Sequence, residues 1–207
     1  MLWANKLGIT DLEELKLAEE RISKQKAVGL LETGRLESLE TGTFKGLSAI
    51  HRYLFEDIYE FAGRIRMVNI TRGFFRFASV DYLGLVLQNI DGMPQSTLDE
   101  IIKKYIEMHV AHPFRKGNGR SIRIWLDLML RREMKLVVDW SRVEKDDYLS
   151  ALERCPFHED ELRTLLKASL TDRIYDRELY LMGIDASYCY DGYCSFPAAA
   201  LRCIHPG

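Results

Sequence analysis

The segment HPFRKGNGR, residues 112–120, lies between two apolar stretches and decides how the middle of the chain folds. Pro113 disfavours the α-helical conformation at the residue before it, so a helix that begins near Thr97 should end at His112. The two glycines of the segment allow a tight turn, and the next helix should begin at about Arg120. The sequence therefore predicts a helix, a short loop and a second helix, with His112 at the mouth of the loop.

Positive charge gathers in this segment although the chain as a whole is nearly neutral. The formal net charge is -2, so a site for anions has to be local. The backbone N–H groups and the dipole at a helix start attract phosphate, and the guanidinium groups of Arg115, Arg120 and Arg123 match phosphate oxygens. His112 can accept a proton near neutral pH. This combination indicates transfer of a phosphorus-containing group to a hydroxyl.

Helical patterns account for most of the chain. Capping boxes at Thr10–Glu13 and Thr97–Glu100 are typical of helix starts, and residues 121–131 are apolar on most sides, as in a buried helix. The expected helices cover about 11–31, 47–61, 80–90, 97–112, 121–131, a segment after a cap at 141–144, 158–170 and 174–182. We therefore expect one all-α domain.

Residues 64–79 have a different pattern. IRMVNI and FFRFAS favour strands and flank a possible turn, which predicts a short β-hairpin. No other convincing strand is found in the sequence, and an isolated hairpin is only marginally stable in water. The hairpin should therefore lie against helices or cover a site as a flap.

Composition excludes several classes of protein. The 207 residues are 47% hydrophobic and 29% charged, a balance typical of soluble domains. We expect no direct contact to nucleic acid, because the net charge gives no overall basic field. We expect a cytoplasmic protein without contact to a membrane, because no apolar run is long enough for a membrane span and no signal peptide is recognisable. Cysteines without a C-x-x-C pair favour reduced thiols over disulfides or zinc; they are Cys155, Cys189, Cys194 and Cys203.

HPFRKGNGR resembles the signature HPFx(D/E)GNGR of Fic-domain proteins, the family of the cell filamentation protein Fic. Residues 43–73 resemble the helix and flap that precede this signature, and residues 119–130 resemble the helix after it. The resemblance implies an all-α, Fic-like helical bundle with a small β-hairpin flap, as one domain over 1–193 with its core at about 41–183. It also implies transfer of AMP from ATP to a hydroxyl side chain of a target protein.

The resemblance assigns roles to individual residues. It makes His112 the general base and Phe114 a buried anchor of the loop. The phosphates would be held by Gly117, Asn118 and Gly119 as an anion hole and by Arg120 and Arg123 at the β and γ positions. The flap that pins the target by strand-like pairing would be Thr71, Arg72, Gly73, Phe74, Phe75, Arg76 and Phe77.

Lys116 departs from the signature, which has Asp or Glu at this position to hold Mg²⁺. A protonated lysine has no lone pair and cannot ligate a hard cation, so no protein ligand for the metal is predicted. Three outcomes stay open: the ammonium replaces part of the charge of the metal, the enzyme uses another ligand or donor, or the site binds nucleotide without transferring AMP. The alternative without a function is that Lys116 merely extends into solvent.

The segment from Ile184 resembles the inhibitory motif (S/T)xxxE(G/N) of compact Fic proteins with a C-terminal inhibitory helix. The matching residues are Ser187, Asp191 and Gly192, in a helix expected at about 184–192. An aspartate near a helix C-terminus calls for a cationic partner, and the resemblance implies Arg123. Pairing of Arg123 with Asp127 is the structural alternative. Residues 194–207 are expected to form a disordered tail.

Other functions and partners are weighed on the same residues. A kinase of the Doc type would have Asn-Lys-Arg in place of Asn118-Gly119-Arg120, and a silent nucleotide-binding module is favoured only by Lys116. A zinc hydrolase built on His109 and His112 matches no known spacing. The sequence does not name the target, although topoisomerases and GTPases are targets within the family. Self-modification and a homo-oligomer stay open; the candidate acceptors are Tyr188, Tyr190 and Tyr193.

Overall fold

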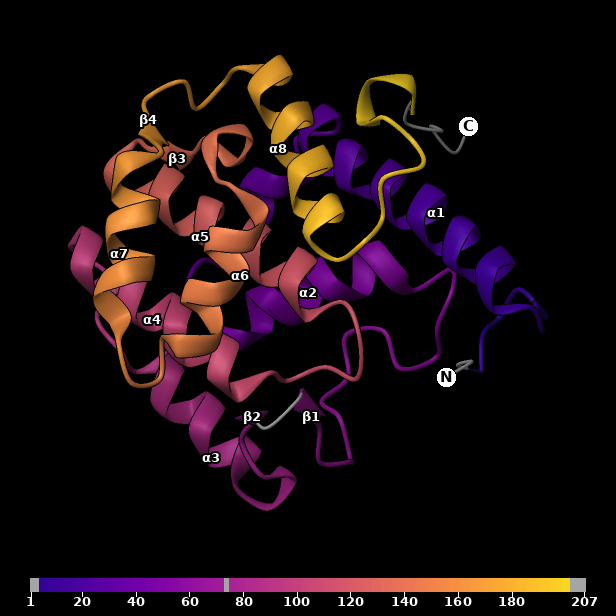
Figure 1. The fold of residues 1–207 in the computed structure, drawn as a ribbon, viewed down its shortest axis with the longest axis horizontal. Coiled ribbons are helices and arrows are strands. Elements are labelled where there is room, and N and C mark those ends of the chain that lie inside the picture. The colour runs from indigo at the N-terminus through magenta and orange to yellow at the C-terminus, as the bar shows by residue number, and fades with distance from the viewer. Residues whose placement is uncertain (1–3, 73–74, 202–207) are drawn as a thin grey trace.

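A computed structural model of the protein describes residues 4–72 and 75–201. This part of the chain forms eight α-helices arranged as a bundle, as expected, and Figure 1 shows α5 running through its middle. Helices α2, α4 and α8 pack against α5, while α1 covers α2 and α8. These helices are α1 (Leu12–Glu32), α2 (Phe44–Phe55), α4 (Leu98–Ala111), α5 (Asn118–Met134) and α8 (Arg177–Tyr190). Within the described ranges no helix combines the length and apolar character needed to cross a bilayer.

The helices that flank the central loop agree with the sequence prediction. Thr97 and Glu100 form the reciprocal capping box at the start of α4. The helix ends at His112, which takes a left-handed conformation with a φ of 48°. Helix α5 begins at Asn118, two residues before the expected position, because Gly117 has a φ of 79° and serves as its N-cap.

Two predicted helix starts were wrong by a few residues. Helix α1 is capped by Asp11, whose carboxylate accepts from the backbone N–H of Glu14, rather than by Thr10. Helix α6 (Lys145–Arg154) has Glu144 as its N-cap. The segment around Ser141 instead forms the 3₁₀ turn η2 (Trp140–Arg142), so it does not cap that helix. Local sequence offers several hydroxyls and carboxylates in a row, and packing selects one of them.

The remaining helices follow the predicted pattern with different bounds. Helix α2 is shorter than the 47–61 predicted, because the chain turns after Phe55 and leaves through Gly63 in the left-handed region. The other two helices are α3 (Val80–Asp91) and α7 (Glu159–Ala168). The apolar positions of α2 and those of α5 from Ile122 to Leu130 lie in one core, in which Trp125 is fully buried.

The described strands are short and form two separate pairs. Strand β1 (Thr71–Arg72) pairs antiparallel with β2 (Phe75–Arg76), which confirms a hairpin at the expected place. The expectation that this hairpin stands alone was wrong, since β3 (Val137–Val138) pairs with β4 (Leu170–Thr171). Two residues per strand are too few for an alternating pattern, so the sequence carried no signal for this second pair.

The C-terminal part differs from the expectation of two short helices and a loose tail. One continuous helix, α8, covers the region and ends in a Schellman motif, in which the N–H of Tyr193 donates to the carbonyl of Tyr188. The following residues up to Leu201 pack beside α1 (Figure 1), and Ala198 is fully buried. The tail expectation is corrected for 194–201, and its remainder, 202–207, lies outside the described residues.

Candidate active site

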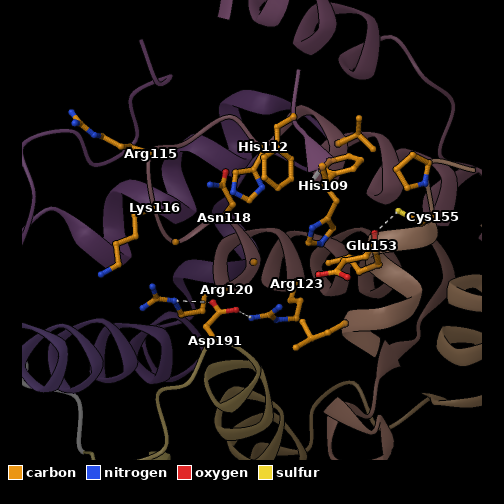
Figure 2. A pocket seen from close by; sticks show the side chains of 18 of the residues that line it. His109, His112, Arg115, Lys116, Asn118, Arg120, Arg123, Glu153, Cys155 and Asp191 are labelled. Carbon is orange, nitrogen blue, oxygen red and sulfur yellow. Dashed lines mark hydrogen bonds and ion pairs between the residues drawn. The ribbon is translucent and has the colours of Figure 1, made fainter. Parts of the chain in front are cut away.

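The central loop opens on a cavity of about 340 Å³. Its walls come from the loop, the start of α5, the end of α6, the hairpin and the turn after α8. Figure 2 shows His112 on one side of this cavity and Arg120, Arg123 and Asp191 on the opposite side. The structure therefore brings the predicted base and the predicted phosphate-binding arginines to the same cavity.

His112 is held at the mouth of the loop by its backbone and its ring. The imidazole stacks on Phe77 of the hairpin, with ring centroids 3.8 Å apart. The backbone carbonyl oxygen of His112 accepts a hydrogen bond from Nε of Arg66 at 2.8 Å. Arg66 is buried and also donates to the carbonyls of Ala78 and Val68, so one guanidinium ties both ends of the hairpin to the end of α4. Arg66 could not be found from the sequence, because its partners are backbone oxygens that no pattern identifies.

Asn118 closes the loop from inside. Its side-chain oxygen accepts from the N–H of Phe114 at 2.8 Å, and its amide nitrogen donates to the carbonyl of Phe114 at 2.7 Å. Phe114 is fully buried, as an anchor should be, and stacks on His51 with centroids 3.8 Å apart. A side chain at Gly117 would lie 2.5 Å from the ring of Phe55. The backbone of the loop is thus fixed before any ligand arrives.

His51 supports the loop from α2. Its Nδ1 accepts from the N–H of Gly63 at 2.8 Å, so Nε2 carries the proton and donates to the carbonyl of Lys116, also at 2.8 Å. Burial lowers the pKa of His51 to about 3, which keeps the ring neutral. His51 therefore positions the loop and takes no part in proton transfer. His51 lies within a helix that the sequence predicts, but no motif in the sequence points to this residue.

Arg120, the last residue of the signature, and Arg123, one turn later in α5, are both buried and already bound to acids. Arg120 is 1% and Arg123 2% exposed. The carboxylate of Asp191 lies between them, with 3.3 Å from Oδ2 to Nε of Arg120 and 3.4 Å from Oδ1 to Nη2 of Arg123. Arg123 also donates to the hydroxyl of Ser187 at 2.7 Å and to its carbonyl at 2.6 Å. The residues of the expected inhibitory motif thus meet at Arg123, and Asp191 engages Arg120 as well.

The alternative pairing of Arg123 with Asp127 is not found. Asp127 accepts from the backbone N–H of Val138 at 2.9 Å and from the indole nitrogen of Trp140 at 2.8 Å. Burial raises the pKa of Asp127 to about 6, because these two hydrogen bonds only partly offset the loss of water. Asp127 therefore holds the segment after α5, and Arg123 pairs with Ser187 and Asp191 instead.

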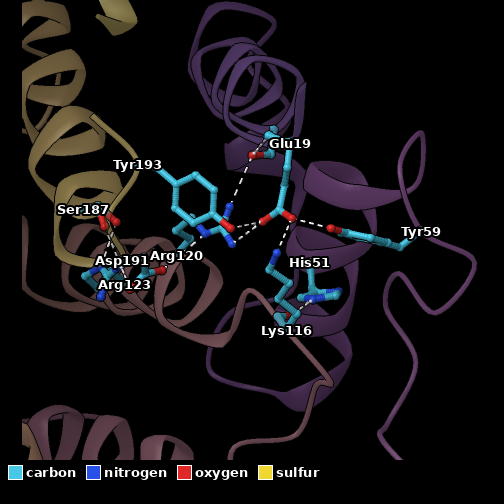
Figure 3. Close-up of polar contacts among 10 residues, drawn as sticks. Glu19, His51, Tyr59, Lys116, Arg120, Arg123, Ser187, Asp191 and Tyr193 are labelled. Carbon is cyan, nitrogen blue, oxygen red and sulfur yellow. Dashed lines mark hydrogen bonds and ion pairs between the residues drawn. The ribbon is translucent and has the colours of Figure 1, made fainter. Parts of the chain in front are cut away.

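A second carboxylate, from α1, completes the site from behind (Figure 3). Glu19 has no exposed surface and lies 2.6 Å from Nζ of Lys116 and 2.8 Å from Nη2 of Arg120. It also accepts from the hydroxyls of Tyr59 and Tyr193. Burial alone would raise the pKa of Glu19, but the charges of Arg120 and Lys116 outweigh it and hold the pKa at about 2. Lys116 therefore does not extend freely into solvent.

Glu19 was missed because nothing near it in the sequence distinguishes it. It lies in a run of acidic and basic residues on the first helix, and its partners are 40 to 174 residues away along the chain. Only the packing of α1 against α2 and α8 brings these groups together. A buried charge with several partners is a feature of the tertiary structure.

Comparison with known proteins relates the chain to one family. Residues 43–130 match the sequence model of the Fic/DOC family. Over these residues the chain is similar to Fic-domain proteins. It is 29% identical over 189 residues to "Protein adenylyltransferase VbhT" of Bartonella schoenbuchensis, a match that covers 84% of this chain and 38% of VbhT. It is 31% identical over 134 residues to "Probable protein adenylyltransferase Fic" of Salmonella typhimurium, covering 59% of this chain and 64% of that protein.

Solved structures support the Fic-like fold. The BepC protein of Bartonella tribocorum, solved with bound AMPPNP, superposes with a TM-score of 0.67 at 20% identity, over 83% of this chain and 93% of BepC. The effector BepA superposes with a TM-score of 0.69 at 21% identity, over 81% of this chain and 65% of BepA. The all-α bundle with a hairpin is thereby confirmed as a Fic fold.

The central loop does not fit Mg²⁺ at position 116, where the signature has an acid. Lys116 offers an ammonium, and its nearest carboxylate, Glu19, already binds two cations and two hydroxyls. Within residues 4–72 and 75–201 no group of three or more His, Cys, Asp or Glu side chains could hold a metal ion. The residues present therefore suit an anion in this cavity better than a divalent cation.

Several of the other predicted site residues line the same cavity. Arg115 lines it, but its guanidinium points away from Arg120 and Arg123 in Figure 2. Phe75 and Phe77 of the flap line it as well, whereas Gly73 and Phe74 lie outside the described residues. The three candidate tyrosines are buried; they are Tyr188, Tyr190 and Tyr193.

Removal of the Asn118 side chain should destabilise the domain. Asn118→Ala leaves the buried N–H and carbonyl of Phe114 without partners, which costs about 1–3 kcal/mol in free energy of unfolding. Urea unfolding measures the loss, with Asn89→Ala, on the exposed face of α3, as the matched control. An Asn118 variant as stable as the control would contradict the role assigned to this side chain.

Proposed function

We propose that this protein transfers AMP from ATP to a hydroxyl side chain of a target protein. The observation that carries the proposal is one cavity lined by His112, the start of α5, Arg120 and Arg123. His112 takes the proton of the target hydroxyl as its oxygen bonds to the α-phosphorus. The bond from that phosphorus to the bridging oxygen breaks, and pyrophosphate leaves. The two arginines and the N–H groups at the helix start stabilise the charge on the phosphates.

The hairpin is the proposed docking element for the target. Strands β1 and β2 pair with each other, and Phe77 just after them stacks on His112. An extended segment of the target that pairs with an edge of the hairpin would bring its hydroxyl to the imidazole. The relatives named as protein adenylyltransferases support this class of substrate.

We further propose that the turn after α8 inhibits the enzyme. Asp191 engages both Arg120 and Arg123, so it competes with the β and γ phosphates for the same cations. Aspartate is one methylene shorter than the glutamate of the family motif, and both of its contacts are longer than 3.2 Å. This grip is weaker than an ideal charge-assisted hydrogen bond, which supports inhibition that ATP can displace.

Asp191→Ala should therefore raise the rate of AMP transfer by about tenfold or more. Asp172→Ala, the same change at an exposed position, is the control and should leave the rate unchanged. An unchanged rate in Asp191→Ala contradicts the inhibitory role. Ending the chain before Ile184 is not an equivalent test, because it would cut α8 and remove buried residues of the core.

The proposed activity is tested by mass spectrometry of proteins from a cell lysate. The lysate is incubated with ATP and the Asp191→Ala protein, and peptides that carry AMP on Ser, Thr or Tyr are identified. We expect such peptides with Asp191→Ala and none with the double variant Asp191→Ala, His112→Ala. Absence of AMP-bearing peptides with both proteins contradicts the proposal.

A second candidate function is a nucleotide-binding interaction module that does not transfer AMP. The observation that favours it is the ion pair of Lys116 with Glu19, which occupies the metal-binding position of the signature. Such a module would bind an ATP analogue but would produce no modified peptide even when Asp191 is removed. The same two measurements therefore separate the two functions.

A further inference from the structure

The ion pair of Lys116 and Glu19 has a consequence for how the nucleotide binds. We infer that Lys116 takes the place of a divalent metal and that its ammonium turns from its buried counter-ion, Glu19, to the triphosphate, so that this site takes a metal-free nucleoside triphosphate. The inference rests on the proposed function only in assuming that the cavity takes a nucleotide. It assigns to Glu19 a role as a built-in counter-ion that the phosphates replace.

The geometry of the pair supports this exchange (Figure 3). One oxygen of Glu19 lies 2.6 Å from Nζ of Lys116 and the other 2.8 Å from Nη2 of Arg120. A carboxylate that bridges two cations in this way makes the contacts that two oxygens of a phosphate would make. Lys116 lines the cavity and its side chain is 26% exposed, so its ammonium can turn from Glu19 to a ligand.

The charge of the site argues against an added divalent cation. Three cations, Lys116, Arg120 and Arg123, face the two carboxylates of Glu19 and Asp191. A magnesium ion beside the ammonium would be repelled by these cations, and the carboxylate next to Lys116, that of Glu19, is already bound to two of them. A free triphosphate, in contrast, supplies negative charge that the three cations can bind once Asp191 withdraws and Lys116 turns from Glu19.

Two tyrosines let Glu19 lose its contact with the ammonium of Lys116. The hydroxyls of Tyr59 and Tyr193 both donate to the carboxylate of Glu19. This carboxylate therefore keeps hydrogen bonds after the ammonium of Lys116 turns to the ligand. Tyr193 follows Asp191 by two residues in the same turn, and its N–H donates to the carbonyl of Tyr188. A ligand that displaces Asp191 therefore acts on the group that holds Glu19 as well.

Binding of the non-hydrolysable analogue AMPPNP, measured by calorimetry with MgCl₂ or with EDTA, tests the inference. For the unaltered chain we expect equal or tighter binding in EDTA. Lys116→Glu, which restores the acid of the signature, should bind about tenfold tighter with Mg²⁺ than with EDTA. Lys103→Glu has the same charge change on the exposed side of α4 and should behave like the unaltered chain.

Two further variants guard against a folding defect. Lys116→Gln removes the charge without placing a second acid beside Glu19, and it should weaken binding in EDTA by about tenfold. Glu19→Gln removes the competitor and should tighten binding in EDTA, with thermal unfolding of each variant measured in parallel. Looser binding by Glu19→Gln in a folded protein contradicts the role of Glu19 as a displaced counter-ion.

The outcomes separate this inference from the proposed function. Binding by the unaltered chain that is about tenfold tighter with Mg²⁺ overturns the inference, while AMP transfer measured with Mg²⁺ would leave the proposed function standing. No binding in either solution, by the unaltered chain and by Asp191→Ala, overturns both. A Lys116→Glu protein that stays folded and indifferent to Mg²⁺ also overturns the inference.

Discussion

Replacement of His112 by alanine should lower the rate of AMP transfer by about 10²–10⁴-fold, the usual contribution of a general base. The loss is expected in the rate and not in nucleotide binding, because Arg120 and Arg123 stay in place on the opposite side of the cavity. Initial rates of label transfer from ATP, measured in the Asp191→Ala protein, and the affinity for AMPPNP separate the two effects.

The control for this experiment is His158→Ala, at the exposed N-terminus of α7 and far from the signature in sequence. It should transfer AMP at the rate of the parent protein. If the His112 variant keeps the rate of this control, the imidazole is not the base and the proposed mechanism is wrong. If it loses nucleotide affinity instead, the imidazole contributes to binding.

Replacement of Glu19 by glutamine should lower the free energy of unfolding by about 3–5 kcal/mol, the usual loss when one partner of a buried ion pair is removed. The change leaves Arg120 buried and takes the shared carboxylate from Lys116. Glu13→Gln, at an exposed position on the same helix, is the matched control. Urea unfolding at neutral pH measures the difference, and a loss equal to that of the control contradicts the network.

The same variant should change the pH dependence of stability. The pKa of Glu19 is about 2 in the folded protein, against an ordinary value of 4.5 for a glutamate. A lowered pKa contributes stability that is fully present above the unfolded value and is lost as the pH falls through the folded value. The gap in free energy of unfolding between the unaltered chain and Glu19→Gln should therefore narrow between about pH 5 and pH 2. A constant gap over this range contradicts the assigned pKa.

The central loop could be predicted because its determinants are local. Pro113 ends one helix, Gly117 permits the left-handed turn, and the capping box at Thr97 starts the helix that carries His112. The position of the cationic cluster at a helix start follows from the same residues. Short-range backbone preferences fix such a segment almost independently of the remainder of the chain.

The residues behind the site could not be predicted, because their roles depend on contacts between distant segments. Glu19, His51 and Arg66 bind groups supplied by other helices or by backbone carbonyls, and each has an ordinary local context in the sequence. For Asp191 the motif and the helix end indicated a cationic partner. The added contact to Arg120 depends on how α8 packs against α5, which no local pattern contains.

Transfer from ATP labelled at either the α or the γ phosphate tests the central claim most directly. The Asp191→Ala protein is incubated with a cell lysate and each form of ATP in turn, and the label retained on protein is measured with and without the His112→Ala change. The account predicts that protein retains the label from α-labelled ATP and retains none from γ-labelled ATP. It also predicts that the α label is lost when His112 is replaced by alanine. Label from the γ position only, which indicates a kinase, or no label from either form, would contradict it.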